Sequence, residues 1–196
     1  MLIAYLHGFQ ANSKAQKASI LAKTLPKVDD TIKFLSLDFD DDIKLAYYSL
    51  CQFIEKAKEY DEDICLVGSS MGGFQALLLS IRYNLKVALI NPCLYPSKFC
   101  LDNQLLGKEL TNFATGAKFT ITQDAFDFIL AKEKIISSYR KDKTLVLLQK
   151  GDEVLDYRYA LEKLSDAALV DVEEGGEHRY ANFHTKVPLI VDFFKR

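Results

Sequence analysis

Six short apolar runs recur along this chain and alternate with helical patterns. The runs occupy residues 2–6, 32–37, 63–67, 86–90, 144–149 and 168–172. Most of them are continuously apolar, which is typical of strands that are covered on both faces of a parallel sheet. The helical patterns lie at 13–25, 43–59, 71–83 and 157–164, and a last one lies near 184–195. This alternation predicts an α/β fold in which a mostly parallel sheet of about six strands lies between two layers of helices.

A chain of 196 residues is expected to form a single domain, here 1–196, with enough residues for a sizeable core. The segment 92–143 interrupts the alternation, because it joins two predicted core strands yet is too long for a plain crossover. It contains a helical run at 123–138. Two interpretations stay open for this segment: a small cap insertion over the carboxyl edge of the sheet, or a longer crossover that adds only core helix.

The charge of the chain argues against a polyanionic partner. The formal net charge is −2, so no large positive field exists to hold nucleic acid. The first residues lack the basic start and the long apolar stretch of a signal peptide, and no apolar run approaches the ~18–20 residues of a membrane span. A cytoplasmic location is therefore expected. The sequence leaves the oligomeric state open.

The cysteines give no sign of a metal site. They are Cys51, Cys65, Cys93 and Cys100, and they form neither a C-x-x-C pair nor a ligand group with histidine. A reduced thiol is expected for Cys65 inside an apolar strand. A disulfide between Cys93 and Cys100 is an alternative that a reducing compartment disfavours.

The strongest motif follows the predicted strand 63–67 and leads directly into a helical run. It has the form G-x-S-x-G, with Ser70 between Gly68 and Gly72. A serine that projects its hydroxyl from the edge of a sheet must sit on a sharp turn, where side chains two residues away would collide. The motif therefore predicts a nucleophile elbow at Ser70. The neighbouring Ser69 is the weaker candidate, because it lacks glycine at the required distance on both sides.

A serine nucleophile needs a base that is itself oriented by an acid. In folds of this type the acid follows the serine in the chain and the base comes last. Asp152 directly follows the predicted strand 144–149 and is the preferred acid. Asp156 is the second candidate and Glu153 the third. Asp156 is better placed to cap the helix predicted at 157–164.

The base is expected just after the last predicted strand, 168–172. His178 lies there, behind a glycine pair at 175–176 that can turn the chain back over the sheet edge. An imidazole can accept and return a proton near neutral pH. The two other histidines fit less well. His7 comes too early in the chain, where it is expected to hold a turn, and His184 is expected at the surface or in a capping role at the start of the last helix.

Two backbone amides are candidates for an oxyanion hole, the pair of donors that would hold a developing negative charge. One is the amide of Met71, directly after the nucleophile. The other is the amide of Phe9, or alternatively of Gln10, in the loop after the first strand. Gly8 lets this loop approach a substrate closely.

Several motifs together are similar to those of one known family. They are H-G-F at 7–9, G-S-S-M-G-G at 68–73, N-P at 91–92, G-D-E-V-L-D-Y at 151–157 and E-G-G-E-H at 174–178. With this set the chain resembles the YqiA/YcfP-like proteins, which are compact bacterial esterases of the α/β-hydrolase superfamily. The likeness spans nearly the whole chain.

The resemblance implies a three-layer α/β-hydrolase fold and a triad of Ser70, Asp152 and His178. It implies hydrolysis of small carboxylic esters, such as short-chain esters or thioesters, without a cofactor or metal. An acyltransferase or thioesterase with the same triad is an alternative. A non-catalytic binding protein that keeps the hydrolase fold is another.

Overall fold

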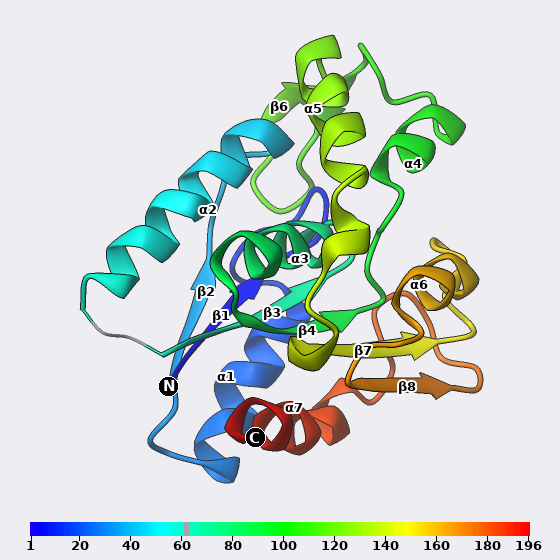
Figure 1. Cartoon of the computed structure of the whole chain (residues 1–196). Helices are drawn as coiled ribbons and strands as arrows, with labels where there is room; N and C mark the ends of the chain where they lie inside the picture. Colours follow the sequence, from blue (N-terminus) through cyan, green and yellow to red (C-terminus); the bar gives the residue numbers. More distant parts are fainter. Residues whose placement is uncertain (61–62) are drawn as a thin grey trace.

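In the described part of the chain, residues 1–60 and 63–196, six parallel strands form one sheet (Figure 1). The structure is a computed structural model of the whole chain. The strands are β1 (Leu2–Leu6), β2 (Lys33–Leu37), β3 (Ile64–Ser69), β4 (Lys86–Ile90), β7 (Thr144–Gln149) and β8 (Leu169–Glu173). Their spatial order is β2-β1-β3-β4-β7-β8, and every neighbouring pair is parallel. Each strand matches one of the predicted apolar runs to within two residues, so the predicted α/β fold with its parallel sheet is confirmed.

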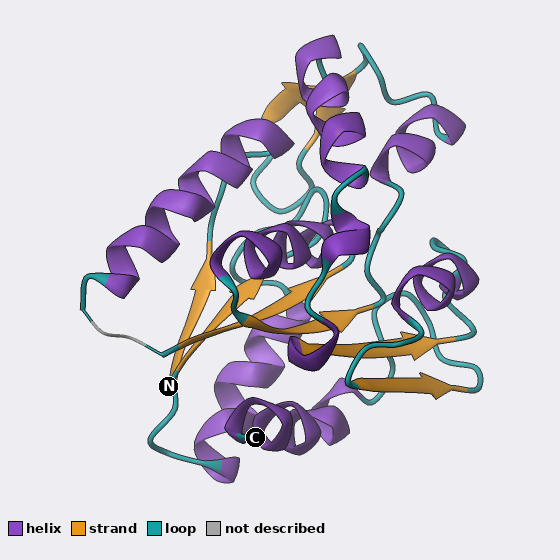
Figure 2. Cartoon of the chain, in the orientation of Figure 1, coloured by secondary structure: helices purple, strands orange, loops and turns teal. Residues whose placement is uncertain are grey.

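Helices cover both faces of this sheet (Figure 2). One face carries α1 (Gln16–Val28) and α7 (Val187–Lys195), and the other carries α2 (Ile43–Lys58), α3 (Met71–Tyr83), α5 (Gln123–Glu133) and α6 (Tyr157–Leu164). The alternation of side chains along β1 shows the arrangement: Ile3 and Tyr5 pack with α1 and α7, whereas Ala4 and Leu6 pack with α2 and α3. The strands are therefore buried on both sides, which explains their continuous apolar runs.

Three predicted helices have different ends in the structure. The first begins at Gln16 rather than near residue 13, because the Asp38 carboxylate accepts hydrogen bonds from the amide and hydroxyl of Ser13 and holds that segment in a loop. The run 123–138 ends as an α-helix at Glu133 and continues in a short 3₁₀ turn. The last helix is preceded by the 3₁₀ turn η3 (Phe183–Lys186). None of the helices within the described residues is both long enough and apolar enough to span a bilayer.

The segment 92–143 folds into the short helix α4 (Pro96–Asp102), a hairpin of β5 (Glu109–Thr111) and β6 (Lys118–Thr120), and α5. The hairpin lies against the loop after β1, where the side-chain amide of Gln10 donates through Nε2 to the Thr111 carbonyl and the rings of Phe9 and Phe119 meet edge to face. Ala125 in α5 is buried in the core beside the sheet. The hairpin of this segment therefore lies beside the loop that follows β1, and α5 adds a helix to the core.

The four cysteines are all buried and carry free thiols. Burial raises the pKa of Cys65 and of Cys93 to about 12, so both stay protonated at neutral pH. The alternative of a bridge between Cys93 and Cys100 is not observed.

Candidate active site

Ser70 sits on the turn that joins β3 to α3. Its backbone has φ 56° and ψ −124°, a conformation that a residue with a side chain rarely adopts. Hydrogen bonds on both sides hold the turn: the Ser70 amide donates to the Ile90 carbonyl, and the Cys93 amide donates to the Ser70 carbonyl. The amino-terminal end of α3, which carries a partial positive charge, begins at the next residue. This is the geometry expected of a nucleophile elbow.

The two glycines around Ser70 are required for different reasons. A Cβ at Gly68 would lie 2.4 Å from the carbonyl oxygen of Gly72, so the first glycine relieves a clash within the turn itself. A Cβ at Gly72 would lie 2.2 Å from the carbonyl oxygen of His7, so the second glycine lets α3 pack against the end of β1. A side chain at Gly68 would thus collide within the turn itself, whereas a side chain at Gly72 would collide with a segment far away in the sequence.

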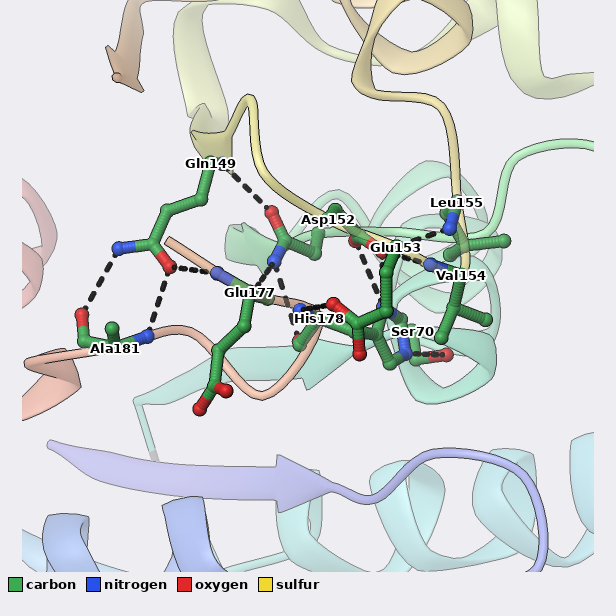
Figure 3. A network of polar contacts seen from close by, with 10 residues as sticks. Ser70, Gln149, Asp152, Glu153, Val154, Leu155, Glu177, His178 and Ala181 are labelled. Carbon is green, nitrogen blue, oxygen red and sulfur yellow. Dashed lines mark hydrogen bonds and ion pairs between the residues drawn. The ribbon is translucent and has the colours of Figure 1, made fainter. Parts of the chain in front are cut away.

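The structure brings the three predicted triad residues together at the carboxyl edge of the sheet (Figure 3). The Ser70 Oγ lies 3.1 Å from His178 Nε2. On the other side of the ring, His178 Nδ1 lies 2.8 Å and 3.0 Å from the two carboxylate oxygens of Asp152. Because a carboxylate can only accept, Nδ1 carries the proton and Nε2 is free to accept the Ser70 hydroxyl proton.

The loop after β7 separates the roles of its acidic residues. Asp152 Oδ1 accepts hydrogen bonds from the amides of Val154 and Leu155, and its side chain is only 2% exposed. Asp156 caps α6 by accepting from a backbone amide of the helix, as the capping interpretation expected. Glu153 accepts the backbone amide of His178, and this bond lowers the pKa of its carboxyl. Only Asp152 faces the imidazole ring.

The remaining alternatives lie elsewhere. His7 is buried, its Nδ1–H donates to the Gly8 carbonyl, and its ring stacks on Phe39 at 4.0 Å. Burial lowers its pKa, so the ring is neutral and holds the loop after β1. His184 is exposed on η3. Ser69 is the buried last residue of β3.

The two candidate oxyanion donors lie beside a small cavity. Phe9 and Met71 both line a space of about 40 Å³, whose wall also includes Ile121 and Ile129 from the segment above the sheet. In residues 1–60 and 63–196, neither the Phe9 amide nor the Met71 amide donates to a protein group. Both donors therefore remain available to a bound molecule.

A larger cavity of about 540 Å³ adjoins the first and opens onto the triad. Ser70 and His178 line it, together with the aromatic side chains of Phe9, Phe99 and Phe113. Phe9 belongs to the walls of both cavities. Ser70 and His178 line only the larger of the two cavities, and the smaller one shares Gly8, Phe9 and Gln10 with it.

The loop that carries His178 is held by residues that form no recognisable sequence motif. Gln149, the buried last residue of β7, accepts hydrogen bonds through Oε1 from the amides of Glu177 and Ala181. Its own backbone amide donates to the side chain of Asn91, which in turn donates to the carbonyls of Glu177 and His178. Only the Asn-Pro pair at 91–92 could have drawn attention to this network.

A Gln149→Leu variant tests this network. We expect kcat/KM for an ester substrate to fall by about 10- to 100-fold, because a small displacement of His178 breaks its alignment with Ser70. The free energy of unfolding should fall by about 1–3 kcal/mol, since two partly buried amides lose their acceptor. Steady-state kinetics and urea unfolding measure both. Gln123→Leu, on an exposed position, is the control; equal behaviour of the two variants would contradict the role of Gln149.

Comparison with known proteins gives both the family and the fold. The family model described as Uncharacterised protein family (UPF0227) matches residues 1–195. A UPF0227 protein of Vibrio atlanticus is 26% identical over 190 residues, which cover 91% of each chain. This agrees with the resemblance that the motifs indicated.

Three solved structures whose names describe hydrolases, esterases or lipases share this arrangement at low sequence identity. Est1E of Butyrivibrio proteoclasticus with bound ferulic acid has a TM-score of 0.74 at 18% identity, over 100% of this chain and 90% of that one. Mouse alpha/beta hydrolase domain-containing protein 10 has a TM-score of 0.65 at 18% identity, over 99% of this chain and 89% of that one. A monoacylglycerol lipase of Paleococcus ferrophilus has a TM-score of 0.66 at 13% identity, over 98% of this chain and 94% of that one. The chain therefore has the α/β-hydrolase fold and belongs to the UPF0227 family.

Proposed function

We propose that this protein is a serine hydrolase of small carboxylic esters, with Ser70 as nucleophile, His178 as general base and Asp152 as the acid that orients the base. The observation that carries the proposal is the continuous relay from Oγ to imidazole to carboxylate, with separations of 3.1 Å and 2.8 Å. Hydrogen-bond contact between nucleophile and base, with the base held by a third group, is the arrangement that activates a serine.

In the first half of the reaction, His178 Nε2 takes the hydroxyl proton while Ser70 Oγ forms a bond to the ester carbonyl carbon. The carbonyl oxygen becomes an anion, which the amides of Phe9 and Met71 hold. Asp152 stabilises the imidazolium that has formed. The intermediate then breaks its bond to the alcohol oxygen, and His178 gives its proton to that oxygen as the alcohol leaves.

In the second half, water repeats the sequence on the acyl-enzyme. His178 takes a proton from the water as the water oxygen attacks the acyl carbon. The bond to Ser70 Oγ then breaks, and His178 returns the proton to the serine. The products are one carboxylic acid and one alcohol, and the protein is unchanged.

The two cavities suggest how an ester would lie. The smaller cavity takes the acyl group in this proposal, because the two amides that would hold the carbonyl oxygen belong to residues in its wall. Its volume of about 40 Å³ is well below the ~150 Å³ cavity that accepts benzene, so only a short acyl chain fits. The alcohol part then lies in the larger cavity, beside Ser70 and His178.

Hydrolysis of a series of p-nitrophenyl esters, from acetate to decanoate, tests both the reaction class and the acyl site. We expect kcat/KM to be highest for acetate to butyrate and to fall by at least about tenfold at octanoate, because the longer chain cannot be buried without displacing core side chains. Release of p-nitrophenol measures the rate. Turnover that is absent for every ester would contradict the reaction class, and turnover that rises with chain length would contradict the acyl site.

A further inference from the structure

The amino-terminal end of α1 faces the cavity in which the proposed alcohol group lies. Ala15, Gln16 and Lys17 all line that cavity. The helix is 13 residues long, its N-cap residue provides no side-chain hydrogen bond, and its first turn contains no acidic residue. The free backbone N–H groups of such an end and its partial positive charge attract anions.

Lys17 adds a full positive charge at the same place. The residue is only 8% exposed, yet its ammonium group makes no hydrogen bond or close ion pair with any residue in 1–60 or 63–196. Within these ranges the fully enclosed side-chain polar atoms without a partner are Gln75 Oε1 and the Tyr180 hydroxyl. The Lys17 ammonium is not among them, so it keeps some contact with open space, and Lys17 is one of the residues that line the cavity.

The surroundings of Lys17 keep it charged at neutral pH. Burial lowers its pKa to about 8, since the low-dielectric interior disfavours the ammonium. The carboxylates of Asp152 and Glu177 oppose this effect, and the guanidinium of Arg179 adds to it. A buried cation without a counter-ion is costly, and an anionic ligand would remove that cost.

Arg179 is a second cation on the same wall. It directly follows the proposed base, lines the cavity and makes no ion pair with another described residue. The lining residues include no aspartate or glutamate, although the whole chain has a net charge of −2. The cavity wall is therefore positively charged, although the protein as a whole has a negative net charge.

We propose that the amino-terminal end of α1, Lys17 and Arg179 form an anion subsite that binds a carboxylate or phosphate on the alcohol part of the ester. This inference rests on the proposed function, because the reacting carbonyl is placed at Ser70. The preferred substrates are then short-chain acyl esters of an alcohol or phenol that itself carries an anionic group.

A pair of substrates that differ only in charge tests the subsite. 3-Acetoxybenzoate carries a carboxylate where 3-acetoxybenzamide carries a neutral amide, and both release acetate. We expect the wild-type protein to favour the benzoate by about tenfold or more in kcat/KM at pH 7, because charge-assisted hydrogen bonds strongly favour the anion. In Lys17→Met the ratio should fall towards one, and Lys17→Arg should retain most of it. Lys23→Met, exposed on the same helix, should keep the wild-type ratio.

A binding measurement separates failure of the subsite from failure of the proposed reaction. Titration calorimetry with 3-hydroxybenzoate and with phenyl phosphate should show binding to the wild type, at least about tenfold weaker binding to Lys17→Met and weaker binding to Arg179→Gln. The tighter of the two ligands identifies which anion is preferred. If neither ester is turned over but this binding pattern holds, the reaction class fails and the subsite stands. A benzoate-to-benzamide ratio near one in the wild type, or binding that Lys17→Met leaves unchanged, overturns the subsite.

Discussion

A Ser70→Ala variant is expected to lose hydrolysis of p-nitrophenyl acetate by about 10⁴- to 10⁶-fold in kcat and to lose labelling by a fluorophosphonate probe completely. Both losses have one cause. The attacking oxygen at the turn between β3 and α3 is absent, so neither the ester carbonyl nor the phosphorus of the probe can form a covalent bond. The binding cavities and His178 remain, which is why a small residual rate above the reaction in water is expected. Rates measured under saturating ester, and intact-protein mass after probe treatment, test the two losses.

Ser69→Ala is the matched control for this variant. Ser69 is the adjacent serine and lies buried at the end of β3, whereas the ring of His178 contacts Ser70. We therefore expect the Ser69 variant to be labelled once per chain, with the label on Ser70 in a peptide map. Labelling that survives in Ser70→Ala and disappears in Ser69→Ala would reverse the assignment of the nucleophile.

Asp152→Asn is expected to reduce kcat by about 10⁴-fold while the fold is kept. The asparagine carbonyl can still accept the amides of Val154 and Leu155, which now bond to Asp152 Oδ1, so the loop keeps its shape. Its NH₂ group, however, would face His178 Nδ1 as a donor. The imidazole must then place its proton on Nε2, and in that tautomer it cannot accept the hydroxyl proton of Ser70. Steady-state kinetics together with thermal unfolding separates this effect from loss of structure.

Asp156→Asn supplies the comparison for the second acidic candidate. Asp156 accepts the Arg158 amide at the start of α6 and pairs with the Arg158 guanidinium at an exposed position. Asparagine caps helices about as well as aspartate, so we expect kcat within about twofold of wild type and a stability change below ~1 kcal/mol. A larger loss of kcat in Asp156→Asn than in Asp152→Asn would identify Asp156 as the acid instead.

The sheet and the candidate triad were accessible from local patterns. Continuous apolar runs mark strands that are covered on both faces, and β1 is such a strand because α1 and α7 cover one side and α2 and α3 the other. Parallel strands place all their carboxyl ends at one edge. For this reason residues that directly follow a strand, such as Ser70 after β3, Asp152 after β7 and His178 after β8, could be expected to lie near one another.

Other contacts depend on the packing of distant segments and have no local signal. Gln149 looks like the polar end of an apolar strand, and its side chain acquires a role only because the chain at 177–181 returns to it. In the sequence Lys17 looks like one of three lysines on an amphipathic helix. In the folded protein it is buried, and the first turn of α1 borders the same cavity as Ser70 and His178.

The order of strands and helices, the sharp turn at Ser70 and the positions of an acid and a histidine after later strands could be predicted from the sequence alone. These features follow from side-chain periodicity and from backbone preferences that act over a few residues. Three relations appear only in the folded protein: the Asp152 carboxylate faces the imidazole of His178, a large cavity opens beside Ser70 next to a smaller one, and two cations line the larger cavity. Such relations depend on distances between residues far apart in the chain, and those distances are set when the two layers of helices pack against the sheet.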